Sequence, residues 1–186
     1  MKYMFMTGTQ VVRWILLTGA CVWGLTAPAG AVLVEWNGHF YGTTPVDDWE
    51  NAEAWAVDLG GHLVTIDDAA EEAFIESTFL SGDDLDTTWW IGLTCPEPLD
   101  YTDPGKWIWA AGTPVSYTNW RTGQPDGGQG SDRYAGINYL GGGDSRWDNF
   151  PVSSAYRYQG IVEIVPEPAT LALLGLGGVA LLRKRR

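Results

Sequence analysis

The stretch WENAEAWAVDLGGHLVTIDDAAEEAFI, residues 49–75, carries the clearest folding pattern in this chain of 186 residues. Its apolar side chains recur at helical spacing, at Trp49, Ala52, Trp55 and Leu59. Gly60 follows, where a helix commonly ends. HLVTI, residues 62–66, predicts a short strand, and residues 67–80 predict a second helix. The stretch therefore predicts two helices joined by a strand.

The residues before this stretch predict how its first helix begins. VLVEWNGHFYGTT, residues 32–44, alternates like an edge strand and ends in turn residues. Thr44 is placed to cap the helix, and Pro45 suits its first position. Asp47 and Asp48 then lie in the first turn, where the helix dipole favours anions.

The second helix has a defined start and an apolar side. Asp67 or Asp68 is the expected cap. The expected buried residues are Phe74, Ile75 and Phe79. TWWIGL, residues 88–93, and KWIWA, residues 106–110, predict two further strands. YQGIVEI, residues 158–164, predicts a final strand that can pair with the first and bring the ends of the domain together.

A long segment, residues 110–150, consists mostly of Gly, Pro, Asp and Asn with scattered aromatic residues. We expect little regular structure in it. A loop of this length in a compact domain is usually either functional or disordered. Its aromatic residues argue against disorder, so the sequence predicts a functional loop in which Trp120 and Trp147 pack beneath the surface.

The first 29 residues have the layout of a secretory signal peptide. Lys2 and Arg13 precede an apolar run, residues 14–25. The small residues APA, residues 27–29, follow as a cleavage site. Export with removal of residues 1–29 is the prediction, and an uncleaved membrane anchor is the alternative. LTGAC, which ends at Cys21, faintly resembles a lipoprotein cleavage box, but its leucine stands one position too early.

The C-terminal end combines a Pro-Glu-Pro triplet, residues 166–168, an apolar run, residues 170–182, and four cations. The run is short for a permanent membrane span, which needs roughly 20 residues. The cations favour a cytoplasmic C-terminus, with the rest of the chain outside. The order of these parts resembles the PEP-CTERM sorting signal of exosortase substrates. That resemblance implies transient inner-membrane insertion, cleavage near the triplet by an exosortase-type peptidase, and a cell-surface or extracellular location in a Gram-negative bacterium.

Removing both ends leaves residues 30–165 as one exported domain with five cations and 22 anions, a net charge of −17. This surface repels nucleic acid and anionic lipid and suits a domain that collects divalent cations; plain solubility is the other explanation. Cys95 is the single cysteine of this part, so it can form no internal disulfide. Packing must hold the core, with nine tryptophans as material. His39 and His62 are too few and too scattered for a zinc site.

The order of these elements resembles the C-type lectin-like domain family from about Trp36 to Ile164. The resemblance rests on residues 49–75, on WWIGL, on W-x-W-x-x-G-x-P-x-x-Y-x-N-W over residues 107–120, and on QPD, RWDNF and GIVEI. Six matches in order are more specific than any single one. The resemblance implies an α/β (α+β) fold, with two helices packed on small antiparallel sheets and a long irregular loop that carries the ligand site.

The resemblance also implies a calcium site in that loop. QPD places a side-chain carbonyl and a carboxylate on either side of Pro125, and in the family this proline follows a cis bond. The glycines that follow let the loop turn back. Calcium takes six to eight oxygen ligands from carboxylates, carbonyls and water. Transferred by position, the metal and carbohydrate ligands are Gln124, Asp126, Asp132, Asp148 and Asn149.

The sequence departs from the family at several of these positions. The family usually has Asn before Asp after the tryptophan, whereas Asp148 precedes Asn149 here, and Asp132 stands where Glu is usual. Gly127 and Arg133 replace acids of the auxiliary calcium site that some members have. Two acids remain near that auxiliary site, Asp100 and Asp103. The family's usual cysteine pairs are absent, and the residues near those positions are Tyr134, Val152 and Val162.

The implied function is calcium-dependent carbohydrate binding, because vicinal sugar hydroxyls can replace water on the ion while the same Gln, Asp and Asn side chains form hydrogen bonds with those hydroxyls. In the family, Gln-Pro-Asp accompanies galactose-type sugars. GGQGS, residues 127–131, lacks the aromatic residue that galactose binders often add. The alternative is a calcium-independent adhesin or structural biofilm-matrix protein that binds protein partners. An enzyme is not predicted, because no nucleophile–His–acid motif occurs.

Overall fold

The structure is a computed structural model that describes residues 33–81, 87–126, 130–139, 141–153 and 155–166. The predicted signal peptide and nearly all of the sorting tail lie outside these ranges. A search of the described part of the chain finds no helix with the length and apolar character needed to cross a membrane.

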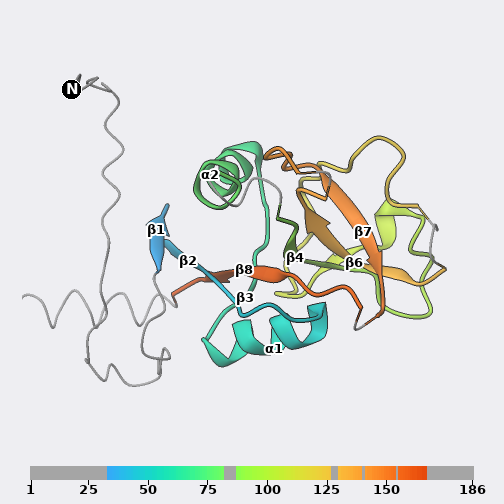
Figure 1. Cartoon of the computed structure of the whole chain (residues 1–186), viewed down its shortest axis with the longest axis horizontal. Helices are drawn as coiled ribbons and strands as arrows, with labels where there is room; N and C mark the ends of the chain where they lie inside the picture. The colour runs from blue at the N-terminus through green and yellow to red at the C-terminus, as the bar shows by residue number, and fades with distance from the viewer. Residues whose placement is uncertain (1–32, 82–86, 127–129, 140, 154, 167–186) are drawn as a thin grey trace, which may run out of the picture.

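The described residues form an α+β domain, as predicted. Its helices are α1 (Trp49–Asp58), α2 (Ala69–Phe79) and a short 3-10 helix, η2 (Pro104–Lys106). Its strands are β1 (Val34–Trp36), β2 (His39–Thr43), β3 (His62–Leu63), β4 (Trp89–Thr94), β5 (Ile108–Trp109), β6 (Asp132–Ile137), β7 (Trp147–Pro151) and β8 (Gln159–Ile164). The strand order is β1-β2-β8-β4-β6-β7, with β3 on β8 and β5 on β4. Figure 1 shows α1 and α2 on opposite sides of these strands.

The first predicted strand is a hairpin rather than one edge strand. Asn37 and Gly38 have φ values of 51° and 87°, which reverse the chain between β1 and β2. Tight hairpin turns of this kind need positive φ at both central residues, and Asn-Gly is the preferred pair. β2 then pairs antiparallel with β8, so the predicted contact between the first and last strands is confirmed.

The predicted start of α1 is wrong by four residues. Asp48 is the cap, and its carboxylate accepts from the backbone N of Asn51 at 3.0 Å. Thr44 is buried and serves β8 instead, because its Oγ1 accepts from the backbone N of Gly160 at 2.8 Å. A backbone bridge between Asp47 and Tyr158, with N–H···O hydrogen bonds in both directions, also holds the chain before Asp48 outside the helix. These tertiary hydrogen bonds outcompete the local helix signal.

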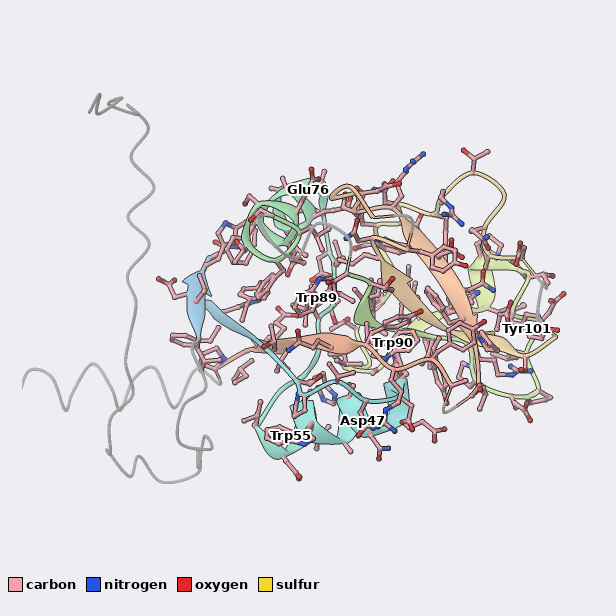
Figure 2. All side chains as sticks on the ribbon, in the orientation of Figure 1. Asp47, Trp55, Glu76, Trp89, Trp90 and Tyr101 are labelled. Carbon is pink, nitrogen blue, oxygen red and sulfur yellow. The ribbon has the colours of Figure 1, made fainter. Side chains whose placement is uncertain are left out.

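The buried face of α1 also differs from the expected one. Trp49, Ala52 and Ala56 are buried, whereas Trp55 is 39% exposed and lies on the outer side of α1 (Figure 2). The small alanines let α1 lie close to the sheet. In α2 the expected cap and core are confirmed: Asp68 accepts from Ala70 and Glu71, and Ile75 and Phe79 are buried, while Phe74 is half-buried and stacks on Trp36.

Strand β4 carries the centre of the core. Its successive tryptophans face opposite sides of the sheet: Trp89 contacts Phe79 of α2, and Trp90 donates to the backbone oxygen of Asp47, just before α1 (Figure 2). Gly92 lets β4 approach β3, because a Cβ there would lie 2.3 Å from the backbone oxygen of Leu63. The stretch WWIGL is therefore packed from both faces.

The prediction of little regular structure over residues 110–150 is wrong in its second half. This segment contains β6 and most of β7, which pair with each other, and β6 also pairs with β4. The glycine-rich, polar sequence hides these strands because their partners are distant in the chain. Residues 111–126, in contrast, form no extended strand and lie over the β6–β7 end of the sheet (Figure 1).

Tyr134, which stands near a position where the family usually has a cysteine, links β6 to α1. Its ring stacks on Trp49 of α1 with a centroid separation of 4.6 Å and an interplanar angle of 5°. Its hydroxyl donates to Glu50 at 2.6 Å. The contact fastens β6 to α1 without a disulfide, and the single cysteine of the described residues, Cys95, is free and buried.

Candidate functional site

A buried carboxylate of α2 supports the long loop from below. Glu72 is 5% exposed and accepts hydrogen bonds from the Tyr117 hydroxyl at 2.5 Å, Asn119 Nδ2 at 3.0 Å and Trp147 Nε1 at 3.1 Å. It thereby connects α2, the loop and β7 directly before Asp148. Sequence reasoning missed this residue, because a glutamate in the first turn of a helix reads as a solvated dipole partner.

Tryptophans form a packed layer beside Glu72. Trp120 contacts Trp107 at 4.9 Å and Trp147 at 5.7 Å between ring centroids, each pair near edge-to-face. The predicted packing of Trp120 and Trp147 beneath the loop is confirmed. The backbones of the two segments also pair, since Trp147 N donates to Asn119 O at 2.8 Å and Arg121 N donates to Trp147 O at 2.9 Å.

The two segments predicted to form the ion site meet in the structure. The Gln124–Pro125 peptide bond is cis, as the family resemblance implies. Asp126 N donates to Gln124 Oε1 at 2.9 Å and to Asn149 Oδ1 at 3.1 Å. Asn149 Nδ2 returns a hydrogen bond to Asp126 O at 2.7 Å. Residues 23 positions apart are therefore held side by side.

Asp132 joins the same cluster from the start of β6. Asn149 Nδ2 also donates to Asp132 O at 3.2 Å. Asp132 and Asp148 are 2% and 4% exposed, respectively, whereas Asp126 is exposed. Burial raises the pKa of the Asp148 carboxyl above its ordinary value; Arg121 opposes this rise, and the charges of Asp126 and Asp132 add to it. The predicted residues thus gather three carboxylates that repel one another.

The reversed order of Asp148 and Asn149 has a structural consequence. Both ends of the Asn149 amide are engaged with backbone groups of Asp126 and Asp132, so this side chain ties the segments together. Of the two neighbours, Asp148 supplies a buried carboxylate to the cluster. An amide oxygen has two lone pairs, so Asn149 keeps one for a further contact.

Two residues that the sequence did not single out complete the cluster. Arg121 forms an ion pair with Asp148 through Nη2 and Oδ2, and its Cζ lies 5.3 Å from the ring centroid of Tyr139. Tyr139 is 47% exposed and packs edge-on against Phe150. One feature of the sequence could have pointed to Arg121: residues 30–165 contain only five Lys and Arg residues, and Arg121 is one of them.

Arg133, which replaces an acid of the auxiliary calcium site that some family members have, contacts the loop after β4. Arg133 donates to the backbone oxygens of Cys95 at 3.0 Å and Leu99 at 3.2 Å, and its Nε lies 3.2 Å from Glu97 Oε1. Two acids remain nearby but are used locally: Asp100 accepts from Thr102, and Asp103 accepts from Gly105. Gly127 lies outside the described residues. The guanidinium fastens the loop after β4 to β6.

Another group of ligand-type side chains lies away from the loop. Potential ligand atoms of His39, Glu71 and Glu163, from β2, α2 and β8, lie within 4.8 Å of one another. His39 Nδ1 lies 2.6 Å from Glu163 Oε1, and Tyr41 donates to Glu71 at 2.8 Å. Burial raises the pKa of Glu71 to about 7 and also raises that of Glu163. The sequence showed His39 only as an isolated histidine; the sheet brings the acids to it.

Comparison with known proteins identifies the family of this domain. The family model for the lectin C-type domain matches residues 46–154, which is more than half of the chain. The chain belongs to the C-type lectin domain family. A second match, to the PEP-CTERM protein-sorting motif, covers residues 165–186 and implies export and processing at the cell envelope.

This C-type lectin domain is similar to curated lectins from animals. It is 34% identical over 104 residues to the galactose-specific lectin nattectin of Thalassophryne nattereri, covering 55% of the chain and 59% of that protein. It is 30% identical over 144 residues to the alpha-N-acetylgalactosamine-specific lectin of Patiria pectinifera, covering 74% and 82%. The chain therefore spans less than two thirds of nattectin but most of the second relative.

Solved structures agree on the fold. The C-type lectin CEL-I from Cucumaria echinata superposes with a TM-score of 0.60 and 24% identity, covering 70% of this chain and 93% of that one. A calcium-independent type II antifreeze protein superposes with a TM-score of 0.58 and 25% identity, covering 76% and 95%. The fold is thus shared by a C-type lectin and by a calcium-independent antifreeze protein.

Proposed function

We propose that this chain is an exported, calcium-dependent carbohydrate-binding protein. Residues 1–29 are its signal peptide, residues 30–165 its lectin domain and residues 166–186 its sorting signal. The observation that carries the proposal is the reciprocal hydrogen bonding of Asp126 and Asn149, which brings QPD against the Asp148–Asn149 segment.

The donor set of this cluster fits calcium. The proposed ligands are Gln124, Asp126, Asp132, Asp148 and Asn149. They offer carboxylate and amide oxygens, which are the ligands that this hard cation prefers, and no sulfur or imidazole. Asp132 and Asp148 are buried, and the charges of Asp126 and Asp132 raise the pKa of the Asp148 carboxyl, so a divalent ion would relieve the repulsion among these carboxylates. The bound ion would supply coordination positions for two neighbouring sugar hydroxyls, which the ligand side chains would orient.

A galactose-type sugar or an extracellular polysaccharide that contains it is the proposed ligand class. Gln124 and Asp126 supply the Gln-Pro-Asp motif, and both curated relatives described above are named for galactose or N-acetylgalactosamine. Tyr139 is exposed and offers the aromatic ring that GGQGS lacks; Arg121 lies over one face of this ring, and the sugar would pack on the other. A tyrosine ring can pack on the apolar face of a sugar because its body is apolar, while its hydroxyl remains free to form a hydrogen bond.

Calcium binding by the purified full-length chain tests this proposal. Saturating calcium at a hundredfold excess over its dissociation constant stabilises the fold by about 2.7 kcal/mol, which chelator removes. Asp126→Ala should abolish the calcium response and galactose-competed glycan binding. Asp58→Ala is the matched control, because Asp58 is an exposed aspartate at the end of α1. Glycan binding that persists unchanged in excess chelator would contradict calcium dependence.

A calcium-independent adhesin or biofilm-matrix protein is the second candidate. The ion pair between Arg121 and Asp148 favours it, since it balances a buried acid without a metal, and a calcium-independent protein shares the fold. This candidate predicts that Asp126→Ala and Asp148→Ala leave partner binding intact. A melting temperature that is indifferent to calcium would favour it over the lectin.

The sorting signal gives the proposed place of action. An exosortase-type peptidase would cleave near Pro-Glu-Pro after transient insertion of the tail in the inner membrane, releasing the domain to the surface of a Gram-negative cell. Extracellular calcium-binding modules commonly bind the ion weakly, with dissociation constants of about 10⁻⁴–10⁻³ M. Retention of the protein in a polysaccharide matrix would therefore depend on many simultaneous contacts.

A further inference from the structure

Arg121 is attached by its backbone to both halves of the candidate site. Its N donates to Trp147 O at 2.9 Å, one residue before Asp148, and its O accepts from Gln124 N at 2.8 Å. The isolated bridge between Trp120 and Trp147 adds a further restraint. The base of the side chain is therefore held between two proposed ligands, and only its outer torsions are free to redirect the guanidinium.

The guanidinium has two neighbours of different chemistry. One is the Asp148 carboxylate, with which it forms an ion pair, and the other is the face of Tyr139, with Cζ 5.3 Å from the ring centroid. The side chains of Arg121 and Asp148 are 19% and 6% exposed, so solvent screens the pair weakly. Tyr139 is 47% exposed and can retain a cation over its ring after the carboxylate has been released.

We propose that Arg121 is a resident counter-ion that competes with calcium for Asp148 and thereby sets the calcium affinity of the domain. This inference rests on the proposed calcium site. A guanidinium and a divalent cation repel each other at contact distance, and the same carboxylate oxygen cannot serve both at full strength. Calcium binding therefore requires Arg121 to leave Asp148, with Tyr139 as its second partner. The domain keeps a balanced, folded site at low calcium and responds only when calcium is abundant.

A second arginine, Arg157, and a conservative substitution at Arg121 supply matched controls. Arg157 also pairs with an aspartate, since its Nη2 lies 2.9 Å from Asp47 Oδ1, but its side chain is 53% exposed and the pair lies next to α1. Arg157→Gln changes the net charge as Arg121→Gln does. Arg121→Lys keeps the charge while removing the planar group, and reports whether charge alone is sufficient.

The experiment is calorimetric titration of calcium into the full-length chain and these variants. Arg121→Gln should bind calcium about tenfold more tightly than the unchanged chain, which corresponds to about 1.4 kcal/mol. Arg157→Gln should bind within twofold of the unchanged chain, and Arg121→Lys should stay closer to the unchanged chain than Arg121→Gln does. Equal affinity for Arg121→Gln and Arg157→Gln would overturn the role of Arg121 and leave the calcium site standing. Absence of binding by every variant would overturn both.

Thermal melting gives an independent reading. In chelator, Arg121→Gln should melt below the unchanged chain, because Asp148 is left buried without its cation. In excess calcium this deficit should disappear, whereas Arg157→Gln should match the unchanged chain in both conditions. A purely structural arginine would lower the melting temperature equally with and without calcium, and that result would refute competition.

Discussion

Removal of the Glu72 carboxylate is the sharpest test of how this domain holds its loop. Glu72→Ala deletes the acceptor of three hydrogen bonds, from Tyr117, Asn119 and Trp147. Hydrogen bonds to a charged group contribute about 1.5–3 kcal/mol each, and buried donors left without acceptors cost more than exposed ones. Water can enter beside Tyr117 and Asn119, which are only partly buried, but not at Trp147, which is fully buried.

We therefore expect Glu72→Ala to lower the free energy of unfolding by about 4 kcal/mol. Glu76→Ala is the matched control, because Glu76 lies one turn later on α2 and, among the described residues, its carboxylate accepts one exposed hydrogen bond, from Ser145 at 3.1 Å. Its expected cost is under about 0.5 kcal/mol, as for other surface substitutions. The two variants differ in what the carboxylate touches and share their helix and charge change.

Urea unfolding followed by tryptophan fluorescence measures both costs. Trp107, Trp120 and Trp147 pack against one another beside Glu72, so they report the region directly. Glu72→Ala should also weaken calcium binding, because Trp147 immediately precedes Asp148 and loses its anchor. If Glu72→Ala and Glu76→Ala unfold within 1 kcal/mol of each other, the three hydrogen bonds do not support the loop and our reasoning fails.

Three further predictions concern other parts of the domain. Burial raises the pKa of Glu71 from its ordinary value of 4.5 to about 7. Protonated Glu71 therefore contributes stability that is fully present below pH 4.5 and is lost as the pH rises through 7. Unfolding free energy should therefore fall more steeply between pH 5 and pH 8 in the unchanged chain than in Glu71→Gln, by up to about 3 kcal/mol. Arg133→Gln should cost about 1–3 kcal/mol and speed amide exchange in residues 95–101, with Arg157→Gln as the control; unchanged exchange there would contradict a clamping role. Gly92→Ala should cost about 3 kcal/mol or more, because its Cβ would overlap the Leu63 carbonyl, and a melting temperature within two or three degrees of the unchanged chain would refute this.

Local patterns predicted the elements with a strong signal of their own. Helical spacing and the Asp68 cap located α2, and the apolar run WWIGL located β4 although its strand partners are distant in the chain. They failed where a distant strand competed for the same backbone. Thr44 has the residue type of a helix cap, but its hydroxyl accepts from the backbone N of Gly160 instead. Residues 132–137 have the composition of a loop, but they pair with β4 and β7 as a strand. Propensity is a weak prior that tertiary hydrogen bonds override.

By itself, the sequence determined which oxygen-bearing side chains were available and which family they resemble: QPD, an aspartate at position 132, and Asp148–Asn149 after a tryptophan. Only the tertiary structure decided their roles. It made Asn149 the tether between two segments, placed Arg121 on Asp148, and put Glu72 and Tyr139 next to residues far away in the chain. Which cation faces a given carboxylate depends on contacts across tens of residues, and these exist only after the sheet has brought β7 beneath the loop.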